Sequence, residues 1–283
     1  MAEKSAFVVS ADWLEEHLGQ EGLRIVDASW YLPAQERDAR TEYEAGHIPG
    51  AVFFDQDAAV EPGADLPHTL PRPAVFTEHV SALGISDGDT IVVYDGPGML
   101  AAPRVWWMFR VMGAAKVYVL DGGIDRWKAD GRPMSTEIPV YPKGVFNAAF
   151  DASAVVGFDE MRAVVASGSS QIADARSAGR FTGKEAEPRP GLRSGRMPGA
   201  RNVPVLSLSE NGHLKSLDAL RATLEGAGID PSAPVVTTCG SGVTAAVITL
   251  ALNSLGNQDA RLYDGSWSEW ASRDDTPVET GEQ

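Results

Sequence analysis

The chain of 283 residues has 39 acidic and 24 basic side chains, which give a net charge of −15 and a pI near 4.7. This balance offers no broad positive field for a nucleic-acid backbone or an anionic lipid surface, so we predict neither nucleic acid nor a membrane as a partner. The hydrophobic content of 43% and the charged content of 22% are typical of a soluble globular protein, and the length suits two domains of about 140 residues.

Helices and strands alternate through the first part of the chain. Apolar residues at helical spacing predict a helix over 11–18, and a short strand follows from Leu23 and ends on Asp27. After a polar connection, the turn HIPG at 47–50 leads into a brief strand, and the long loop over 56–73 comes next. The pattern then predicts, in order, a helix over 75–83, a buried strand over 90–95, a buried helix over 101–112, a strand over 116–121 and a helix from 122.

The second part of the chain repeats the first. Residues 131–150 are rich in Pro and Gly with little periodicity, and beyond them the same pattern begins again. Positions that match between the parts lie 143 to 149 residues apart and include Asp27 with Asp174, Asp95 with Cys239, Asp121 with Asp264, and Trp127 with Trp270. Such a near-constant spacing indicates an internal duplication.

The duplication predicts an α/β protein with a first domain over 1–135, a linker over 136–152 and a second domain over 153–283. Each domain should hold a mostly parallel sheet flanked by helices on both faces, with sites at the C-terminal ends of its strands. Asp95 and Cys239 occupy corresponding strand ends, so only the second domain carries a nucleophile there.

Cys239 is the only cysteine and cannot form an internal disulfide. A free thiol fits a reducing compartment, and no segment reads as an export signal or a membrane span, so we expect a cytoplasmic protein. The alternative for a lone cysteine is a small buried hydrophobe in an ordinary strand-to-helix turn.

The loop CGSGVT at 239–244 favours a reactive thiolate. Gly240 and Gly242 permit backbone conformations that are closed to other residues, so successive N–H groups can turn toward the sulfur. A helix expected after Thr244 would place its positive end nearby, and both effects favour the thiolate. A Cys-x5-Arg loop would suit phosphoryl transfer, but Ala245 stands where that arginine would be, so the loop favours attack on sulfur.

Several segments together resemble the tandem-domain rhodanese family, and within it the 3-mercaptopyruvate sulfurtransferases. The resemblance covers nearly the whole chain and rests on HIPGA at 47–51, APRVWWMFR at 102–110, CGSGVT at 239–244 and YDGSWSEW at 263–270. Its most specific feature is the pair of small, neutral residues after the cysteine, because thiosulfate-preferring relatives typically carry bulkier, basic residues there.

The resemblance implies that Cys239 takes sulfane sulfur from the small-molecule donor 3-mercaptopyruvate as a persulfide and releases pyruvate. The sulfur then passes to a thiol, a thioredoxin or cyanide. A thiosulfate sulfurtransferase is the alternative, and a persulfide carrier module without a small-molecule donor is a third. No cofactor is expected, the scattered histidines offer no spacing for a metal, and the chain should be a monomer or weak dimer.

The resemblance also implies roles for individual residues. Arg180 and Arg189, in an irregular Pro-rich loop, match the pair that binds the donor's carboxylate and carbonyl. Ser241, His68 and Asp57 match residues proposed to assist proton movement around the cysteine. Without the resemblance, both arginines would be interpreted as solvated, Ser241 as a small loop residue and His68 as a loop histidine. The remaining predicted substrate contacts are the loop residues Gly240, Gly242, Val243 and Thr244.

His47 is interpreted as a structural residue that braces its turn. Arg196 stands at the matching place in the second domain, where the family usually has histidine. Together with Arg193, it could add positive potential beside the site.

Overall fold

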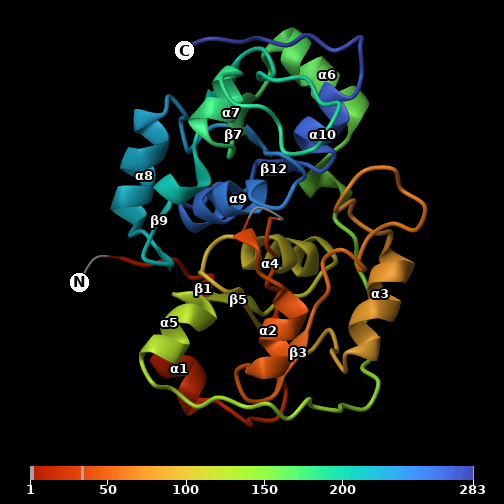
Figure 1. Cartoon of the computed structure of the whole chain (residues 1–283), viewed down its shortest axis with the longest axis vertical. Helices are drawn as coiled ribbons and strands as arrows, with labels where there is room; N and C mark the ends of the chain where they lie inside the picture. Colours follow the sequence, from red (N-terminus) through yellow and green to blue (C-terminus); the bar gives the residue numbers. More distant parts are fainter. Residues whose placement is uncertain (1–2, 33–34, 283) are drawn as a thin grey trace.

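The computed structural model describes residues 3–32 and 35–282. Two α/β lobes are stacked along the long axis of the molecule, with the red-to-yellow part of the chain in one and the green-to-blue part in the other (Figure 1). The outermost limits of the two predicted domains, residues 1 and 283, lie outside the described residues. Among the described helices, none has the length and apolar character needed to cross a bilayer.

The first lobe contains a five-stranded sheet in the order β1-β5-β4-β2-β3, and every neighbouring pair is parallel. Its central strands are buried and rich in Val and Ile, as a parallel sheet covered on both faces requires. The elements are β1 (Val8–Val9), α1 (Ala11–Glu16), β2 (Leu23–Asp27), α2 (Ala39–Ala45), β3 (Ala51–Phe53), α3 (Pro73–Ala82), β4 (Thr90–Tyr94), α4 (Ala102–Val111), β5 (Val117–Leu120) and α5 (Gly123–Ala129).

The second lobe repeats this topology. Its parallel sheet has the order β6-β12-β11-β7-β8, which is the order of the first sheet when strands are matched by position in their lobe. A small antiparallel hairpin, β9–β10, is an addition. The elements are β6 (Val155–Val156), α6 (Phe158–Ser167), β7 (Gln171–Asp174), α7 (Ala178–Thr182), β8 (Ala200–Asn202), β9 (Ser209–Glu210), β10 (His213–Leu214), α8 (Leu217–Gly226), β11 (Val235–Thr238), α9 (Ala245–Ser254), β12 (Ala260–Tyr263) and α10 (Ser266–Ala271), with 3₁₀ turns at Ala152–Ala154 and Val205–Ser207.

Helix α2 is an element that the sequence pattern did not predict, because the segment before the HIPG turn reads as a polar connection. Tyr43 is the one buried residue on α2, so the helix has no apolar periodicity to detect. Asp38 instead caps its N-terminus by accepting a hydrogen bond from the Thr41 amide at 2.6 Å.

The predicted linker over 136–152 has no helix or strand until its last residue, but it is packed against the first lobe rather than free. Phe146 is buried in the apolar core, the Tyr141 hydroxyl donates to the Gly50 carbonyl at 2.9 Å, and Asn147 donates to Asp87 at 2.9 Å. This segment therefore packs as part of the first lobe.

Helices α4 and α9 pack against each other at the centre of the molecule, one from each lobe (Figure 1). Both are apolar around most of their circumference, and their side chains belong to one core cluster that spans the lobes. Since α4 follows β4 and α9 follows β11, the loops after these strands lie at the boundary between the lobes. The duplicated topology therefore places the Asp95 and Cys239 loops close to the opposite lobe.

Candidate active site

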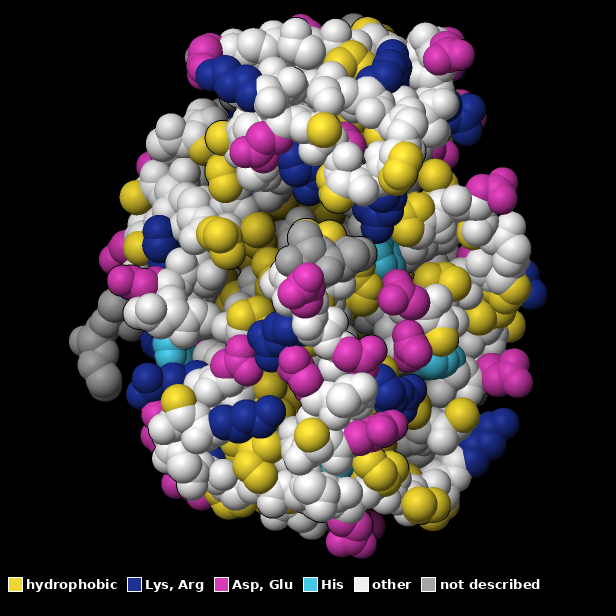
Figure 2. Space-filling view, viewed as in Figure 1, with side chains coloured by type: hydrophobic (Ala, Val, Ile, Leu, Met, Phe, Trp, Pro, Cys, Tyr) yellow, Lys and Arg dark blue, Asp and Glu magenta, His cyan; other side chains and the backbone are white. Residues whose placement is uncertain are grey.

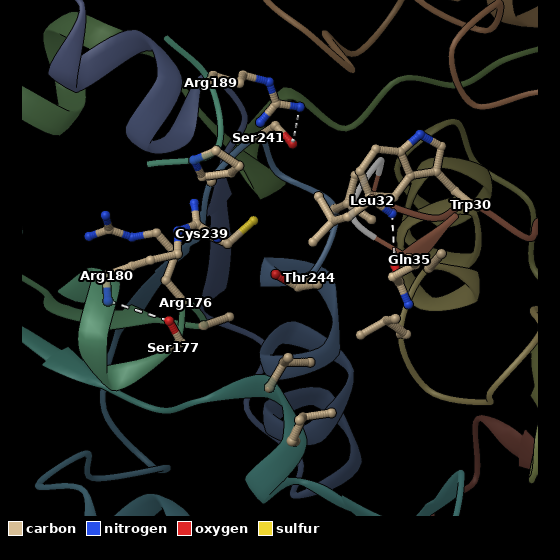
Figure 3. A pocket seen from close by; sticks show the side chains of 18 residues that line it. Trp30, Leu32, Gln35, Arg176, Ser177, Arg180, Arg189, Cys239, Ser241 and Thr244 are labelled. Atoms are coloured by element: carbon tan, nitrogen blue, oxygen red, sulfur yellow. Dashed lines mark hydrogen bonds between the residues drawn. The ribbon is translucent and has the colours of Figure 1, made fainter. Parts of the chain in front are cut away.

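Cys239 follows β11 and is almost fully buried. Its amide donates to the Ser266 hydroxyl at 3.2 Å, and its carbonyl accepts from the Trp267 amide at 2.9 Å. The first turn of α10 thus holds the base of the loop. The sulfur itself points into a cavity, as Figure 3 shows.

This cavity has a volume of about 370 Å³ and is lined by both lobes. In Figure 3, Arg180 lies to the left of the Cys239 sulfur and Arg189 lies above it, while Trp30 and Leu32 lie to the right. On the outside of the molecule, hydrophobic side chains gather around a hollow between the lobes (Figure 2). A small anion could therefore meet positive charge beside the thiol while its apolar part faces the first lobe.

The two glycines of the loop have different roles, which corrects the sequence interpretation. Gly242 has a φ of +82°, a conformation that disfavours any other residue, as predicted. Gly240 does not have a positive φ, but a Cβ there would lie 2.8 Å from Arg180 Nη2. Gly240 therefore leaves room for the guanidinium, which approaches the backbone closely. Gly240, Val243 and Thr244 line the cavity, while Gly242 lies below it against Arg104.

Arg180 does not lie in an irregular loop, as the sequence indicated, but on the short helix α7. Ser177 caps this helix by accepting from the Arg180 amide at 3.4 Å. The Arg180 guanidinium donates to Glu187, whose carboxylate also accepts from Arg176 at 2.8 Å. The sequence analysis missed α7 because a helix of only five residues is too short to show apolar periodicity, and the segment after it is rich in Pro.

Arg189 reaches the cavity from the loop after α7. Its Nη2 is 3.5 Å from the Ser241 Oγ. Figure 3 shows the Arg189 guanidinium beside Ser241 and near the Cys239 sulfur. Burial lowers the pKa of Arg189 below its ordinary value, while the nearby Cys239 acts in the opposite direction. A guanidinium that has lost part of its hydration binds an incoming anion more strongly.

His68 and Asp57 arrive at the site from the first lobe, as predicted. Asp57 Oδ1 is 3.0 Å from His68 Nε2, and the Ser241 Oγ is 2.8 Å from His68 Nδ1. Because a carboxylate only accepts, Nε2 donates to Asp57, and with the ring proton placed there Nδ1 is the acceptor for the Ser241 hydroxyl. The hydrogen bond from His68 is the main reason why the pKa of Asp57 is lowered.

The ends of this hydrogen-bonded chain differ in exposure. The His68 side chain is 4% exposed and the Asp57 side chain is 69% exposed. The Trp30 indole N–H donates to both Asp57 oxygens at 3.2 Å and its ring packs edge-on against His68. A continuous set of hydrogen bonds therefore connects Ser241, in the Cys239 loop, with the exposed Asp57 carboxylate.

Arg104, on α4, joins the two lobes beside the loop. Its guanidinium is 1% exposed and donates to the His68 carbonyl at 2.6 Å and to Asp264 at 2.7 Å. It also lies 3.5 Å from the Gly242 carbonyl. His68 has a φ of +56°, so its carbonyl is fixed in a strained backbone conformation that this contact helps to hold. Sequence reasoning gave Arg104 no role, although it lies within the APRVWWMFR segment.

The matching loop of the first lobe is filled by its own side chain. The Asp95 carboxylate accepts hydrogen bonds of 2.6 to 2.9 Å from the amides of Gly98, Leu100, Ala101 and Ala102. Burial raises the pKa of Asp95, and these amides act in the opposite direction. By the same 144-residue match, the corresponding positions after Cys239 are Gly242, Thr244, Ala245 and Ala246, of which the Ala246 amide donates to the Val243 carbonyl at 3.3 Å.

His47 and Arg196 hold equivalent turns away from the cavity. His47 is fully buried, with its ring nitrogens near the carbonyls of Tyr43 and Glu137. Arg196 donates to the Gly281 carbonyl and its backbone pairs with Glu279. Arg193 likewise donates to carbonyls around α10. Neither arginine lines the cavity.

Comparison with known proteins is consistent with this geometry. The rhodanese-like domain family matches residues 10–130 and 158–273. A 3-mercaptopyruvate sulfurtransferase from Escherichia coli K12 is 45% identical over 97% of this chain and 98% of that protein, and a thiosulfate sulfurtransferase from Gallus gallus is 42% identical over 94% and 93%. The crystal structure of SseA from E. coli superimposes with a TM-score of 0.85 at 42% identity, covering 92% of this chain and 98% of that one.

The chain therefore belongs to the rhodanese family and contains two rhodanese-like domains. Within residues 3–32 and 35–282, no group of three or more His, Cys, Asp or Glu side chains is arranged to hold a metal ion.

The contacts of Arg104 predict a large effect on stability. In the variant Arg104→Met, Asp264 and the His68 carbonyl lose their buried partner, so unfolding should become easier by about 3–5 kcal/mol. Arg110→Met, on the same helix, is the matched control because Arg110 only stacks on Phe7 and Trp106, which is worth about 1 kcal/mol. Thermal denaturation measures both, and equal melting temperatures would contradict the assigned role.

Proposed function

We propose that this protein is a sulfurtransferase that takes sulfur from 3-mercaptopyruvate onto Cys239, releases pyruvate and passes the sulfur to an acceptor. The proposal rests on one observation above all, which is that the Cys239 sulfur faces a cavity with Arg180 and Arg189 on one wall. Two guanidinium groups suit the carboxylate and the adjacent carbonyl of an α-keto acid.

In the first step, the Cys239 thiolate attacks the sulfur of the bound donor. A new S–S bond forms while the donor's C–S bond breaks, and the electron pair of that bond leaves with the carbon fragment as the enolate of pyruvate. Protonation of the enolate carbon gives pyruvate, and the enzyme holds a persulfide. Arg180 and Arg189 would stabilise the enolate because its charge spreads onto the oxygens that they bind.

The chain formed by Ser241, His68 and Asp57 supplies a route for the proton of this step. The Ser241 hydroxyl would donate its proton toward the leaving fragment and then recover one from Nδ1 of a His68 ring protonated on both nitrogens, which the Asp57 carboxylate stabilises through Nε2. Asp57 is largely exposed, so the chain can exchange protons with water. The amides of Gly242 and Thr244 would stabilise the anionic sulfur, as the matching amides stabilise Asp95.

In the second step, an acceptor nucleophile attacks the outer sulfur of the persulfide and restores the thiolate. A small thiol, a thioredoxin or cyanide could each serve, since each attacks sulfur and can enter a cavity open to solvent. A catalytic cysteine without a disulfide partner suits a reducing compartment, so we include a cytoplasmic location in the proposal. A monomer or weak dimer would suffice because one chain supplies both lobes of the site.

Thiosulfate is the alternative donor, and the 42% identity with a thiosulfate sulfurtransferase supports this alternative. The small residues Gly240 and Ser241 favour mercaptopyruvate because they add no positive charge inside the loop. A persulfide carrier module is a weaker alternative, since a carrier needs no pair of arginines for a carboxylate.

We further propose domain limits of 1–135 and 153–283 and a first domain without catalytic activity, because Asp95 fills its loop.

The conclusion is tested by the variant Cys239→Ser. Because the thiolate is the nucleophile, this variant should form no pyruvate from mercaptopyruvate, and it should lose activity with thiosulfate as well. Pyruvate release measures turnover, and mass spectrometry of the wild type should show a gain of one sulfur on Cys239. Appreciable pyruvate formation by the variant would exclude the mechanism.

The donor's position is tested by Arg189→Ala. Loss of one guanidinium should raise KM for mercaptopyruvate by about tenfold to a hundredfold, since a charge-assisted hydrogen bond contributes about 1.5–3 kcal/mol. Arg201→Ala is the control, because Arg201 is exposed on β8. An unchanged KM in steady-state kinetics would show that the donor does not contact Arg189.

The proton route is tested by His68→Asn. Removal of the imidazole should lower kcat for mercaptopyruvate by about a hundredfold, within the usual range for general acid–base groups, and should leave KM nearly unchanged. His79→Asn is the matched control because His79 lies on α3, outside the cavity. A variant that affects KM alone, or neither constant, would argue against a proton-transfer role.

A further inference from the structure

Glu187 is a buried carboxylate directly behind the arginine wall of the cavity. Its side chain is only 2% exposed, and it lies between two guanidinium groups. One oxygen accepts from Arg176 Nη1 at 2.8 Å and from Arg180 Nε at 3.3 Å, and the other accepts from Arg180 Nη2. The function proposed above gives this residue no part.

The charges around Glu187 are arranged in pairs. Arg176 is already paired with Asp174 through three contacts of 2.7 to 3.1 Å, and both side chains are buried. Glu187 therefore serves mainly to pair with Arg180, which stands at the cavity. Among the described residues no carboxylate oxygen lies within 4.0 Å of the Arg189 guanidinium, so Arg189 carries the excess positive charge of the wall.

Burial makes this pairing matter to a bound anion. Water cannot screen a carboxylate with 2% exposure, so the Glu187 charge acts through the low-dielectric wall on whatever Arg180 binds. Its repulsion grows in proportion to the negative charge of the donor. 3-Mercaptopyruvate brings one negative charge near neutral pH, while thiosulfate brings two. The buried carboxylate therefore disfavours the dianion more than the monoanion.

We propose that Glu187 is a specificity-determining residue that acts through Arg180, orienting its guanidinium and limiting the net charge of the cavity so that monoanionic donors are preferred over dianionic ones. This inference rests on the proposed sulfurtransferase function and extends it to the choice of donor. It adds a selective element outside the Cys239 loop, in a segment where sequence reasoning noticed only the arginines.

The decisive variant is Glu187→Gln, which keeps the size of the side chain and an oxygen that can accept from Arg180 but removes the charge. The ratio of kcat/KM for thiosulfate to kcat/KM for mercaptopyruvate should rise about tenfold, which corresponds to about 1.4 kcal/mol. The increase should be smaller at high ionic strength, because salt screens the charge that reaches the open cavity.

Two further variants separate charge from structure. Glu187→Asp retains the charge but is too short to contact both arginines, so kcat/KM should fall for both donors while their ratio stays within about threefold of the wild type. Glu185→Gln makes the same charge change at an exposed position two residues away, and it should leave the ratio unchanged. A loss of structure alone would lower both activities without favouring the dianion.

An unchanged ratio in Glu187→Gln, or a shift toward mercaptopyruvate, overturns the inference. If that variant does not fold, Glu187→Asp decides, because a tenfold change in its ratio would show that geometry rather than charge sets the preference. A wild-type protein that turns over neither donor refutes the proposed function itself. A wild type that uses mercaptopyruvate, combined with an unaffected Glu187→Gln ratio, refutes only the role of Glu187.

Discussion

The buried guanidinium of Arg104 is the interaction on which the site depends most. It projects from α4 of the first lobe and bonds to Asp264 of the second, while also holding the His68 carbonyl. A charge that is 1% exposed remains stable only if its hydrogen bonds are satisfied. The two lobes therefore have one favourable relative placement, and that placement brings His68 within 2.8 Å of Ser241.

The duplicated architecture explains why one lobe carries the nucleophile. Parallel strands of the same order deliver equivalent loops after β4 and β11. In the first lobe, the Asp95 carboxylate takes the loop amides itself, so no outside anion can use them. In the second lobe, Cys239 leaves room for sulfur, and the first lobe contributes His68 and Asp57 instead. The two lobes thus contribute different residues to one shared site.

The wall beside Cys239 shows how a positive site can be built without a large positive charge. Arg176 and Arg180 are paired with Asp174 and Glu187, whereas Arg189 has no carboxylate partner within the described part of the chain. Paired guanidinium groups keep their geometry because each carboxylate restrains them, and their hydrogen-bond donors stay directed. Such an arrangement lets the site select an anion by its shape and hydrogen bonds rather than attract every anion. The overall charge of the protein is −15.

The sequence by itself determined the α/β class and the internal duplication and predicted the nucleophile, because strand and helix periodicity, the spacing of matched residues and the CGSGVT loop are local signals. It also named Arg180, Arg189, Ser241, His68 and Asp57, although only through resemblance to a family. It missed α2 and α7, whose short polar segments show little periodicity, and it assigned a left-handed backbone to Gly240 that the fold does not use.

Only the tertiary structure showed that Arg104 and Glu187 are buried and paired. Their partners lie in other elements or in the opposite lobe, so the sequence does not show which group each charge pairs with. Burial and pairing of a charge depend on what folds over it, and no local pattern records that. The sequence names the residue that reacts, and the packing of the lobes determines which groups hold its surroundings in place.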